Sequence, residues 1–441
     1  MSATVSARRL PLSAVKAEKS TVYLFLWLLL AIFFEYARPG SFISGINTLR
    51  LNSLIPLGLV LACVFAANLR PLSEAWQDPL SKWLLAYFCI IAFGLVHADV
   101  TLYAFNVTKL VLGYLLLAFV IVRICTTLDR IRGVFAVLIM AHLFLLAMNP
   151  AAILNPEQRN YIVGGSFLGD GNDFSLSICI AAPMAIELAL ASKSRLLQLF
   201  WWGSLLVLCL AVVASQSRGG TLGLIAVGGY LWLRSPRKAL TMVLALIAVV
   251  AIVSYAPEQY FERMRTITSY HADGSAMGRI AAWKAAIQMF LDHPFWGVGA
   301  GMFPVSFGTI YRPAEHMPWL TAHSMYFLVL GELALPGIVA LVALIFGNLR
   351  ANRRAVHAQD VVVNDVRQRP FPKGANRVLY LLSTGMVGFA VSGAFLSVAY
   401  YPHIFVLTAL MISARCIAAR EQDAGEPASG TRPARAARRR A

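Results

Sequence analysis

Apolar runs long enough to cross a lipid bilayer recur along this chain. Of its 441 residues, 59% are hydrophobic and 13% are charged. A soluble domain cannot hide so large an apolar fraction, because much of any folded surface remains in contact with water. About 20 apolar residues in a helix cross the roughly 30 Å of hydrocarbon in a bilayer. The sequence therefore predicts an all-α, polytopic integral membrane protein.

The apolar runs predict about twelve transmembrane helices. The expected spans are residues 21–35, 51–69, 80–96, 104–122, 131–148, 174–192, 199–215, 219–233, 239–255, 322–347, 378–397 and 403–418. The expected segments are a cytoplasmic tail at 1–20, N-terminal transmembrane helices at 21–200, a core at 201–347 with an outer loop at 256–321, a cytoplasmic loop at 348–377, C-terminal transmembrane helices at 378–418 and a disordered basic cytoplasmic tail at 419–441.

Basic residues are concentrated on one side of this topology. The chain has 38 Lys and Arg against 21 Asp and Glu, and a cytoplasmic N-terminus places most of the basic residues in cytoplasmic segments. This positive-inside pattern predicts that both termini are cytoplasmic. The basic tail is expected to lie near anionic lipid; it contains Arg432, Arg435, Arg438, Arg439 and Arg440. No aromatic-rich basic domain accompanies the charge, so nucleic acid is not an expected partner.

Three short polar segments interrupt the apolar sequence at 215–220, 278–283 and 322–326. They carry Arg218, Arg279 and His323. A charged group beside an apolar span costs free energy, so such groups are usually kept for a function. All three lie on the outer side of the predicted topology. Two arginines can hold a lipid diphosphate with paired hydrogen bonds, and a histidine can take the proton of a hydroxyl group. The alternatives are interfacial anchoring and simple solvation of each group.

An amphipathic helix is expected in the outer loop. From residue 277 to 290, Arg279, Trp283, Ile287 and Phe290 recur at helical spacing, which predicts a helix on the membrane surface with Arg279 near its N-terminal end. The glycine run at 297–301 permits close backbone approach. It is not a dinucleotide-binding loop, because no strand precedes it and its spacing is G-x-G-x-G.

Several residues are expected to support these three. Ser217 belongs to a turn of small residues that a large anionic group could approach, and Trp283 is a second candidate for substrate contact. Glu332 is expected to be buried and hydrogen-bonded to another span, Glu35 to pair with Arg38, and Lys109 to need a partner or an aqueous cavity. The outer loop has no H-x₃-H or H-E-x-x-H spacing, so no metal is predicted.

Together these motifs resemble the O-antigen ligase and O-antigen polymerase superfamily, which are bacterial envelope polysaccharide glycosyltransferases. The resemblance covers about 201–345. It rests on residues 215–220, on 279–283 leading into 292–299, and on 323–326 followed by 331–332 and 336–337. Residues 35–39 and 172–173 also resemble segments of some superfamily members that are encoded at exopolysaccharide loci. This resemblance slightly favours the exopolysaccharide type of member. Asn172 or Asp173 is expected to cap the sixth span, with a sugar contact as the lesser alternative.

The resemblance implies a multi-pass protein of the bacterial inner membrane that works at the periplasmic face without a cofactor. The donor would be a glycan linked to undecaprenyl diphosphate, and the acceptor a glycan, lipid A core or protein. His323, Arg279 and Arg218 would be catalytic, with Arg218, Arg279, Trp283 and Ser217 binding substrate. An inverting, metal-independent transfer is implied, by a ligase or by a polymerase. A polysaccharide transporter or flippase is the alternative, with Lys109, Glu35 and Glu332 as ion-coupling groups.

Overall fold

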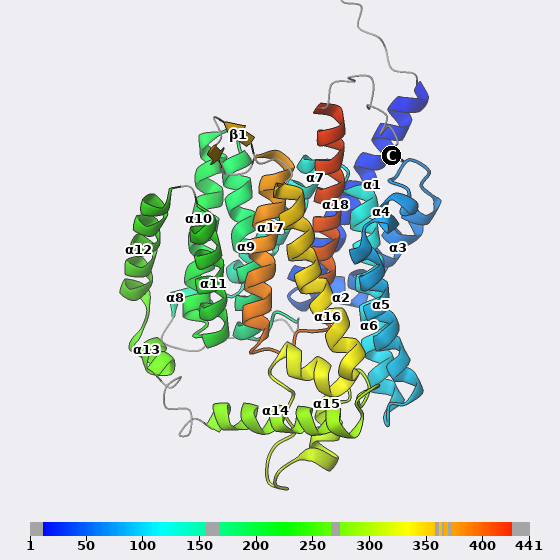
Figure 1. Cartoon of the computed structure of the whole chain (residues 1–441), viewed down its shortest axis with the longest axis vertical. Helices are drawn as coiled ribbons and strands as arrows, with labels where there is room; N and C mark the ends of the chain where they lie inside the picture. The colour runs from blue at the N-terminus through cyan, green and yellow to red at the C-terminus, as the bar shows by residue number, and fades with distance from the viewer. Residues whose placement is uncertain are drawn as a thin grey trace, which may run out of the picture.

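The structure is a computed structural model that describes residues 12–155, 167–235, 237–265, 274–357, 361–363, 366–368 and 373–425. Long helices run side by side in a bundle, and one helix, α14, lies across the end of that bundle (Figure 1). The short hairpin at β1 lies at the opposite end, where α18 also finishes. The basic tail arginines, from Arg432 to Arg440, lie outside the described residues.

The elements follow the chain in a simple order. The long helices of the bundle are α1 (Leu12–Ala37), α3 (Leu51–Phe65), α5 (Pro79–Phe93), α6 (Thr101–Ile124), α7 (Leu128–Met148), α9 (Gly171–Ala191), α10 (Arg195–Ala214), α11 (Arg218–Arg234), α12 (Lys238–Tyr255), α16 (Met325–His357), α17 (Gly374–Gly393) and α18 (Pro402–Gly425). The elements outside the bundle's long helices are η1 (Pro39–Ser41), α2 (Ser44–Thr48), α4 (Leu72–Gln77), η2 (Gly94–Val96), α8 (Ala151–Leu154), α13 (Glu258–Arg265), α14 (Gly274–Asp292), α15 (Phe303–Ser306), η4 (Phe307–Tyr311), β1 (Val361–Val363) and β2 (Val366–Gln368).

The helical, polytopic character expected from the sequence is confirmed. Among the described residues, 7 helices are long and apolar enough to cross a membrane. Each predicted span overlaps one of the long helices, although the ends differ by up to four residues in spans such as 51–69 and 378–397. The count of twelve crossings stays a prediction. The all-α expectation misses one small feature, the antiparallel pair β1–β2, in which Val361 faces Gln368. Helix α18 continues to Gly425, beyond its predicted end at 418.

Buried ion pairs tie the helices together at the end that carries β1. The carboxylate of Glu187 in α9 is fully buried and accepts hydrogen bonds from Arg132 of α7 at 3.0 Å and Arg377 of α17 at 2.6 Å. Arg415 of α18 pairs with Asp78, the N-cap of α5, at 2.7 Å. Breaking such a pair from one side leaves a buried charge uncompensated, at a cost of roughly 3–5 kcal/mol. This end of the bundle is therefore held closed.

Helix α14 packs on α16 through small residues. Ala282, Ala285, Ala286 and Met289 are buried, whereas Ile287 is 43% exposed. The stripe expected from the sequence is therefore divided, because Ile287 is exposed whereas Trp283 stacks on Phe327 of α16. Alanine side chains allow two helices to approach closely, and this close contact decides which face turns inward.

Helix α16 is broken at Ala334, whose φ of 49° and ψ of −144° are not helical. Pro336 has no N–H, so the carbonyl of Glu332 loses its usual partner within the helix. That carbonyl accepts the N–H of Gly299 at 3.0 Å, and the carbonyl of Gly331 accepts the N–H of Val298 at 3.0 Å. The glycine run therefore docks into the break in α16. This is the close backbone approach that its glycines permit.

The side chain of Glu332 secures the same junction. It is 1% exposed and accepts the N–H groups of Gly301 at 2.9 Å and Phe303 at 2.7 Å, together with the hydroxyl of Tyr400. The prediction that Glu332 is buried and hydrogen-bonded is confirmed. Its partners, however, lie in loops and at the start of α15 rather than within another span.

The docking of the glycine run predicts the effect of Gly297→Ala. Gly297 has φ +69°, and a Cβ atom there would lie 2.3 Å from the carbonyl oxygen of Glu332. Strain from the left-handed backbone, together with this contact, is expected to cost about 2 kcal/mol or more. Thermal unfolding of the purified protein in detergent should show a clear loss of stability. Gly228→Ala in α11 is the control, because nothing lies within 4 Å of its added Cβ; equal losses in both variants would contradict the docking.

Candidate active site

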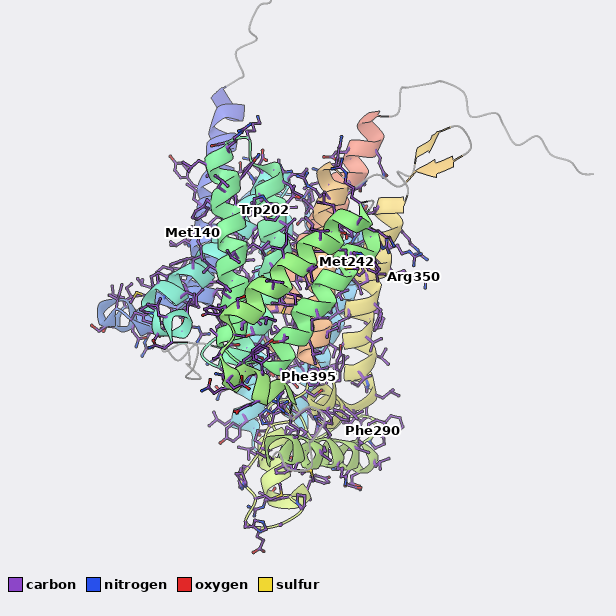
Figure 2. The ribbon with its side chains drawn as sticks, turned by 90° about the vertical axis from the view of Figure 1, so that its left-hand side faces the viewer. Met140, Trp202, Met242, Phe290, Arg350 and Phe395 are labelled. Carbon is purple, nitrogen blue, oxygen red and sulfur yellow. The ribbon has the colours of Figure 1, made fainter. Side chains whose placement is uncertain are left out.

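A polar cavity of about 270 Å³ lies at the end of the bundle that faces α14. Figure 2 shows Phe395, one of its lining residues, at this end, with Phe290 of α14 beyond it. The charged and titratable residues that line the cavity are Asp170, Asp173, Arg218, Arg279 and His323. The other lining residues are Asn172, Gln216, Ser217, Gly219, Thr321, Phe395, Leu396, Ser397 and Tyr401. Arg218, Arg279 and His323, predicted from three separate polar segments, are thus brought together.

Arg218 is the first residue of α11, directly after a tight turn. Ser217 is the N-cap, and its hydroxyl accepts the N–H of Gly220 at 3.1 Å. Gln216 before it has φ +53°, a conformation that non-glycine residues rarely adopt. A Cβ on Gly219 would lie 3.2 Å from the Cβ of Phe395. Ser217 lines the cavity as expected, but it already uses its hydroxyl to hold the turn that presents Arg218.

Arg279 reaches the cavity from α14. That helix begins at Gly274, so Arg279 lies in its second turn, near the N-terminal end as the sequence predicted. The crossing of α14 over the bundle end, rather than the helix terminus, brings Arg279 to the cavity.

His323 precedes α16 in a strained backbone conformation, with φ +47°. Its N–H donates to the hydroxyl oxygen of Ser397 at 2.9 Å, and the hydroxyl of Thr321 donates to the same oxygen at 2.8 Å. Trp283 donates its indole N–H to the carbonyl of Ala322 at 3.0 Å. Strain of this kind costs roughly 1–3 kcal/mol and persists only where surrounding contacts enforce it.

Trp283 is not among the residues that line the cavity. Its ring stacks on Phe327, with centroids 5.0 Å apart and an interplanar angle of 13°. The sequence assigned this tryptophan to substrate contact, whereas the structure places it behind His323, where it fixes the preceding carbonyl.

The surroundings of His323 set its protonation. Partial burial lowers the pKa of His323 from its usual 6.5, the positive charge of Arg279 lowers it further, and the carboxylate of Asp170 opposes both effects. These effects together favour the neutral imidazole, which is the form that can accept a proton.

Of the two carboxylates in the cavity, the sequence singled out Asp173, as a helix cap or a sugar contact, but not Asp170. The N-cap of α9 is Asp170, whose carboxylate accepts the N–H of Asn172 at 2.9 Å. The prediction that Asn172 or Asp173 caps this helix is therefore wrong. Asp173 instead accepts the hydroxyl of Tyr401 at 2.9 Å. The polar run at 169–173 was the signal in the sequence for these carboxylates. It could not show that Asp173 binds Tyr401, which lies 228 positions further along the chain.

Glu35 and Lys109 do not line the cavity. Glu35 accepts the hydroxyl of Tyr114 at 2.9 Å and pairs with Arg38 at 3.4 Å, so the predicted pairing is confirmed. Lys109 is exposed on α6, with its ammonium group 5.9 Å from the centre of the Phe105 ring. Within the described residues, no three side chains of His, Cys, Asp or Glu are grouped so that they could hold a metal ion.

A membrane-embedded helical bundle with a polar, arginine-lined cavity at one end suits an enzyme that handles an anionic lipid. Comparison with known families makes this more specific: residues 203–345 match the family model described as O-antigen ligase. The match confirms the resemblance to the O-antigen ligase and polymerase superfamily, and this family is one of membrane glycan-transfer enzymes. No curated protein matches the chain.

The surroundings of His323 predict how its pKa responds to substitution. Arg279→Gln removes a positive charge and should raise the pKa of His323, whereas Asp170→Asn should lower it, because each charge acts on the imidazolium form. Histidine-selective NMR titration of the purified protein would measure both shifts. Arg312→Gln is the control, since Arg312 lies in the same outer region but does not line the cavity. An unchanged pKa in Arg279→Gln would contradict the proximity of the two groups.

Proposed function

We propose that this cavity transfers a glycan from an undecaprenyl-diphosphate carrier to an acceptor hydroxyl at the periplasmic face of the bacterial inner membrane. The observation that carries the proposal is the convergence of Arg218, Arg279 and His323 in one cavity. Each comes from a different segment of the chain, and all three lie within the part that matches the O-antigen ligase family.

The two arginines supply the charge that the donor requires. A lipid diphosphate is already a good leaving group, so its departure depends on charge neutralisation more than on protonation. Guanidinium groups bind phosphate oxygens through paired, charge-assisted hydrogen bonds and keep their charge at any physiological pH. Two of them at one cavity stabilise the negative charge that develops on the leaving diphosphate, and we therefore propose a metal-independent reaction.

His323 supplies the base. As the acceptor oxygen attacks the anomeric carbon, the neutral imidazole takes the hydroxyl proton. The bond between that carbon and the diphosphate oxygen breaks, and undecaprenyl diphosphate leaves. In-line attack inverts the configuration at the anomeric carbon. The lowered pKa of His323 keeps the base unprotonated, so activity should fall only as the pH drops below about 6.5.

The closed inner end of the bundle favours an enzyme over a transporter. A carrier that alternates access must open both ends in turn. Here Glu187 is buried between Arg132 and Arg377, and Arg415 pairs with Asp78. Each opening of this end of the bundle would separate these buried ion pairs, whereas catalysis at the outer face leaves the pairs intact.

Substitution of the catalytic residues tests the assigned roles. His323→Ala is expected to retain donor binding and to lose about 10²–10⁴ in turnover, the usual contribution of a general base. Arg279→Ala is expected to weaken donor binding as well. Both are measured with purified protein and a carrier-linked glycan, with His293→Ala as control, because His293 is exposed and does not line the cavity. Normal glycan output from well-expressed His323→Ala protein would contradict the assignment of His323 as the general base.

The acceptor class is decided by the glycans that accumulate in cells without this protein. A polymerase passes the growing chain to the next carrier-linked repeat, so its loss should leave single repeats on the carrier. A ligase passes finished polymer to lipid A core or protein, so its loss should leave long chains on the carrier. Cells that keep only His323→Ala should show the same accumulation. Glycan trapped on the cytoplasmic face would instead indicate a transporter.

A further inference from the structure

The cavity is lined by residues from the segment that matches the family model and by residues from outside that segment. Arg218, Arg279 and His323 lie within residues 203–345, which match the family model. Asp173 precedes that part of the chain and Tyr401 follows it, yet both line the same cavity. The groups suited to the diphosphate and to proton transfer thus come from the family segment, and a separate group of residues completes the site.

The geometry of this second group is well defined. Asp173 lies in the first turn of α9, and its Oδ2 atom accepts the hydroxyl of Tyr401 at 2.9 Å. Among the described residues Tyr401 is its one hydrogen-bond partner, which leaves Oδ1 able to accept from a ligand. Asn172 beside it binds Asp170 through both its N–H and its side-chain amide. The ring of Tyr401 packs edge-on against Phe167, with centroids 5.2 Å apart.

We propose that Asp173, Asn172 and Tyr401 form a carbohydrate subsite that selects a neutral, hydroxyl-bearing sugar next to the diphosphate. The inference rests on the proposed function, and it assigns the sugar to the side of the cavity that the family segment does not provide. Carboxylate and amide oxygens accept hydrogen bonds from sugar hydroxyls, and those to a carboxylate are the stronger kind.

The charges in the cavity favour this assignment. Arg218 and Arg279 attract an anionic group, which the diphosphate supplies, whereas Asp170 and Asp173 repel one. A sugar that carries its own carboxylate would place it against two acids when its ring lies at this subsite. A neutral ring brings donors to the same oxygens. A site that bonds a sugar hydroxyl also discriminates against a ligand that lacks this hydroxyl, because the hydrogen bond is then not made.

The size of the cavity is consistent with this selection. At about 270 Å³ it lies near the lower end of ligand pockets, roughly 300 Å³. A cavity of this size suits the diphosphate and the adjoining sugar, so we assign the first sugar of the glycan to this subsite.

The test compares binding of short-chain prenyl diphosphates to the purified, full-length protein in detergent, measured by calorimetry. The probes are the bare prenyl diphosphate, the same lipid carrying N-acetylglucosamine, glucose or galactose, and the same lipid carrying glucuronic acid. In the unsubstituted protein at least one neutral sugar should raise the affinity over the bare lipid by roughly 10- to 100-fold. Glucuronic acid should not.

Two substitutions isolate the subsite. Asp173→Asn should remove most of the gain from the neutral sugar, taken as the ratio of affinities for the sugar-bearing and the bare lipid in the same variant, and allow glucuronic acid to bind better. Tyr401→Phe should reduce the same gain, and it also serves if Asp173→Asn fails to fold. Tyr114→Phe is the matched control, because it removes a tyrosine–carboxylate hydrogen bond, that with Glu35, outside the cavity.

The outcomes separate the subsite from the proposed function. If no neutral sugar raises the affinity, or if the gain survives in both Asp173→Asn and Tyr401→Phe, the subsite is contradicted and the diphosphate site is unaffected. If the bare prenyl diphosphate does not bind the unsubstituted protein, the proposed function itself fails. A loss of the sugar gain in Tyr114→Phe equal to that in Tyr401→Phe would also contradict the subsite, because it would show a general effect of lost hydrogen bonds.

Discussion

The break in α16 is the constraint on which the site depends. A continuous helix through Ala334 would satisfy its own carbonyls and leave the glycine run with nowhere to bind. Because Pro336 and the non-helical Ala334 free the carbonyls of Gly331 and Glu332, the run from Gly297 to Gly301 docks there. This docking anchors the end of α14, and α14 in turn carries Arg279 to the cavity. Glu332 completes the junction by binding the loop and Tyr400.

Two neighbouring tyrosines connect this junction to the cavity. Tyr400 donates its hydroxyl to Glu332 at the broken helix, and Tyr401 donates to Asp173 at the cavity. In the same loop, Ser397 holds the backbone of His323. The short segment between α17 and α18 therefore sets the relative positions of the base, the carboxylate and the helix break. Its residues lie beyond the matched family segment, so contacts from outside that segment help to position His323 within it.

Local patterns in the sequence predicted the helices and the three central residues, because hydropathy and isolated charges in apolar surroundings are local signals. They failed where a distant contact decides the outcome. Trp283 has the character of a substrate contact, but Phe327 and the carbonyl of Ala322 hold it behind the site. Asp173 has the character of a helix cap, but Asp170 takes that role and Tyr401 holds Asp173 in the cavity. No spacing rule relates α9 to a loop more than two hundred residues later.

The central claim is that this cavity transfers a glycan from a lipid diphosphate with no other source of energy. The most direct test incubates the purified protein in detergent, where no membrane gradient exists, with a carrier-linked glycan and candidate acceptors. The account predicts acceptor-linked glycan with inverted anomeric configuration and the release of undecaprenyl diphosphate. It would be contradicted if a folded protein that binds the donor gave no product in detergent but moved carrier-linked glycan across sealed vesicles.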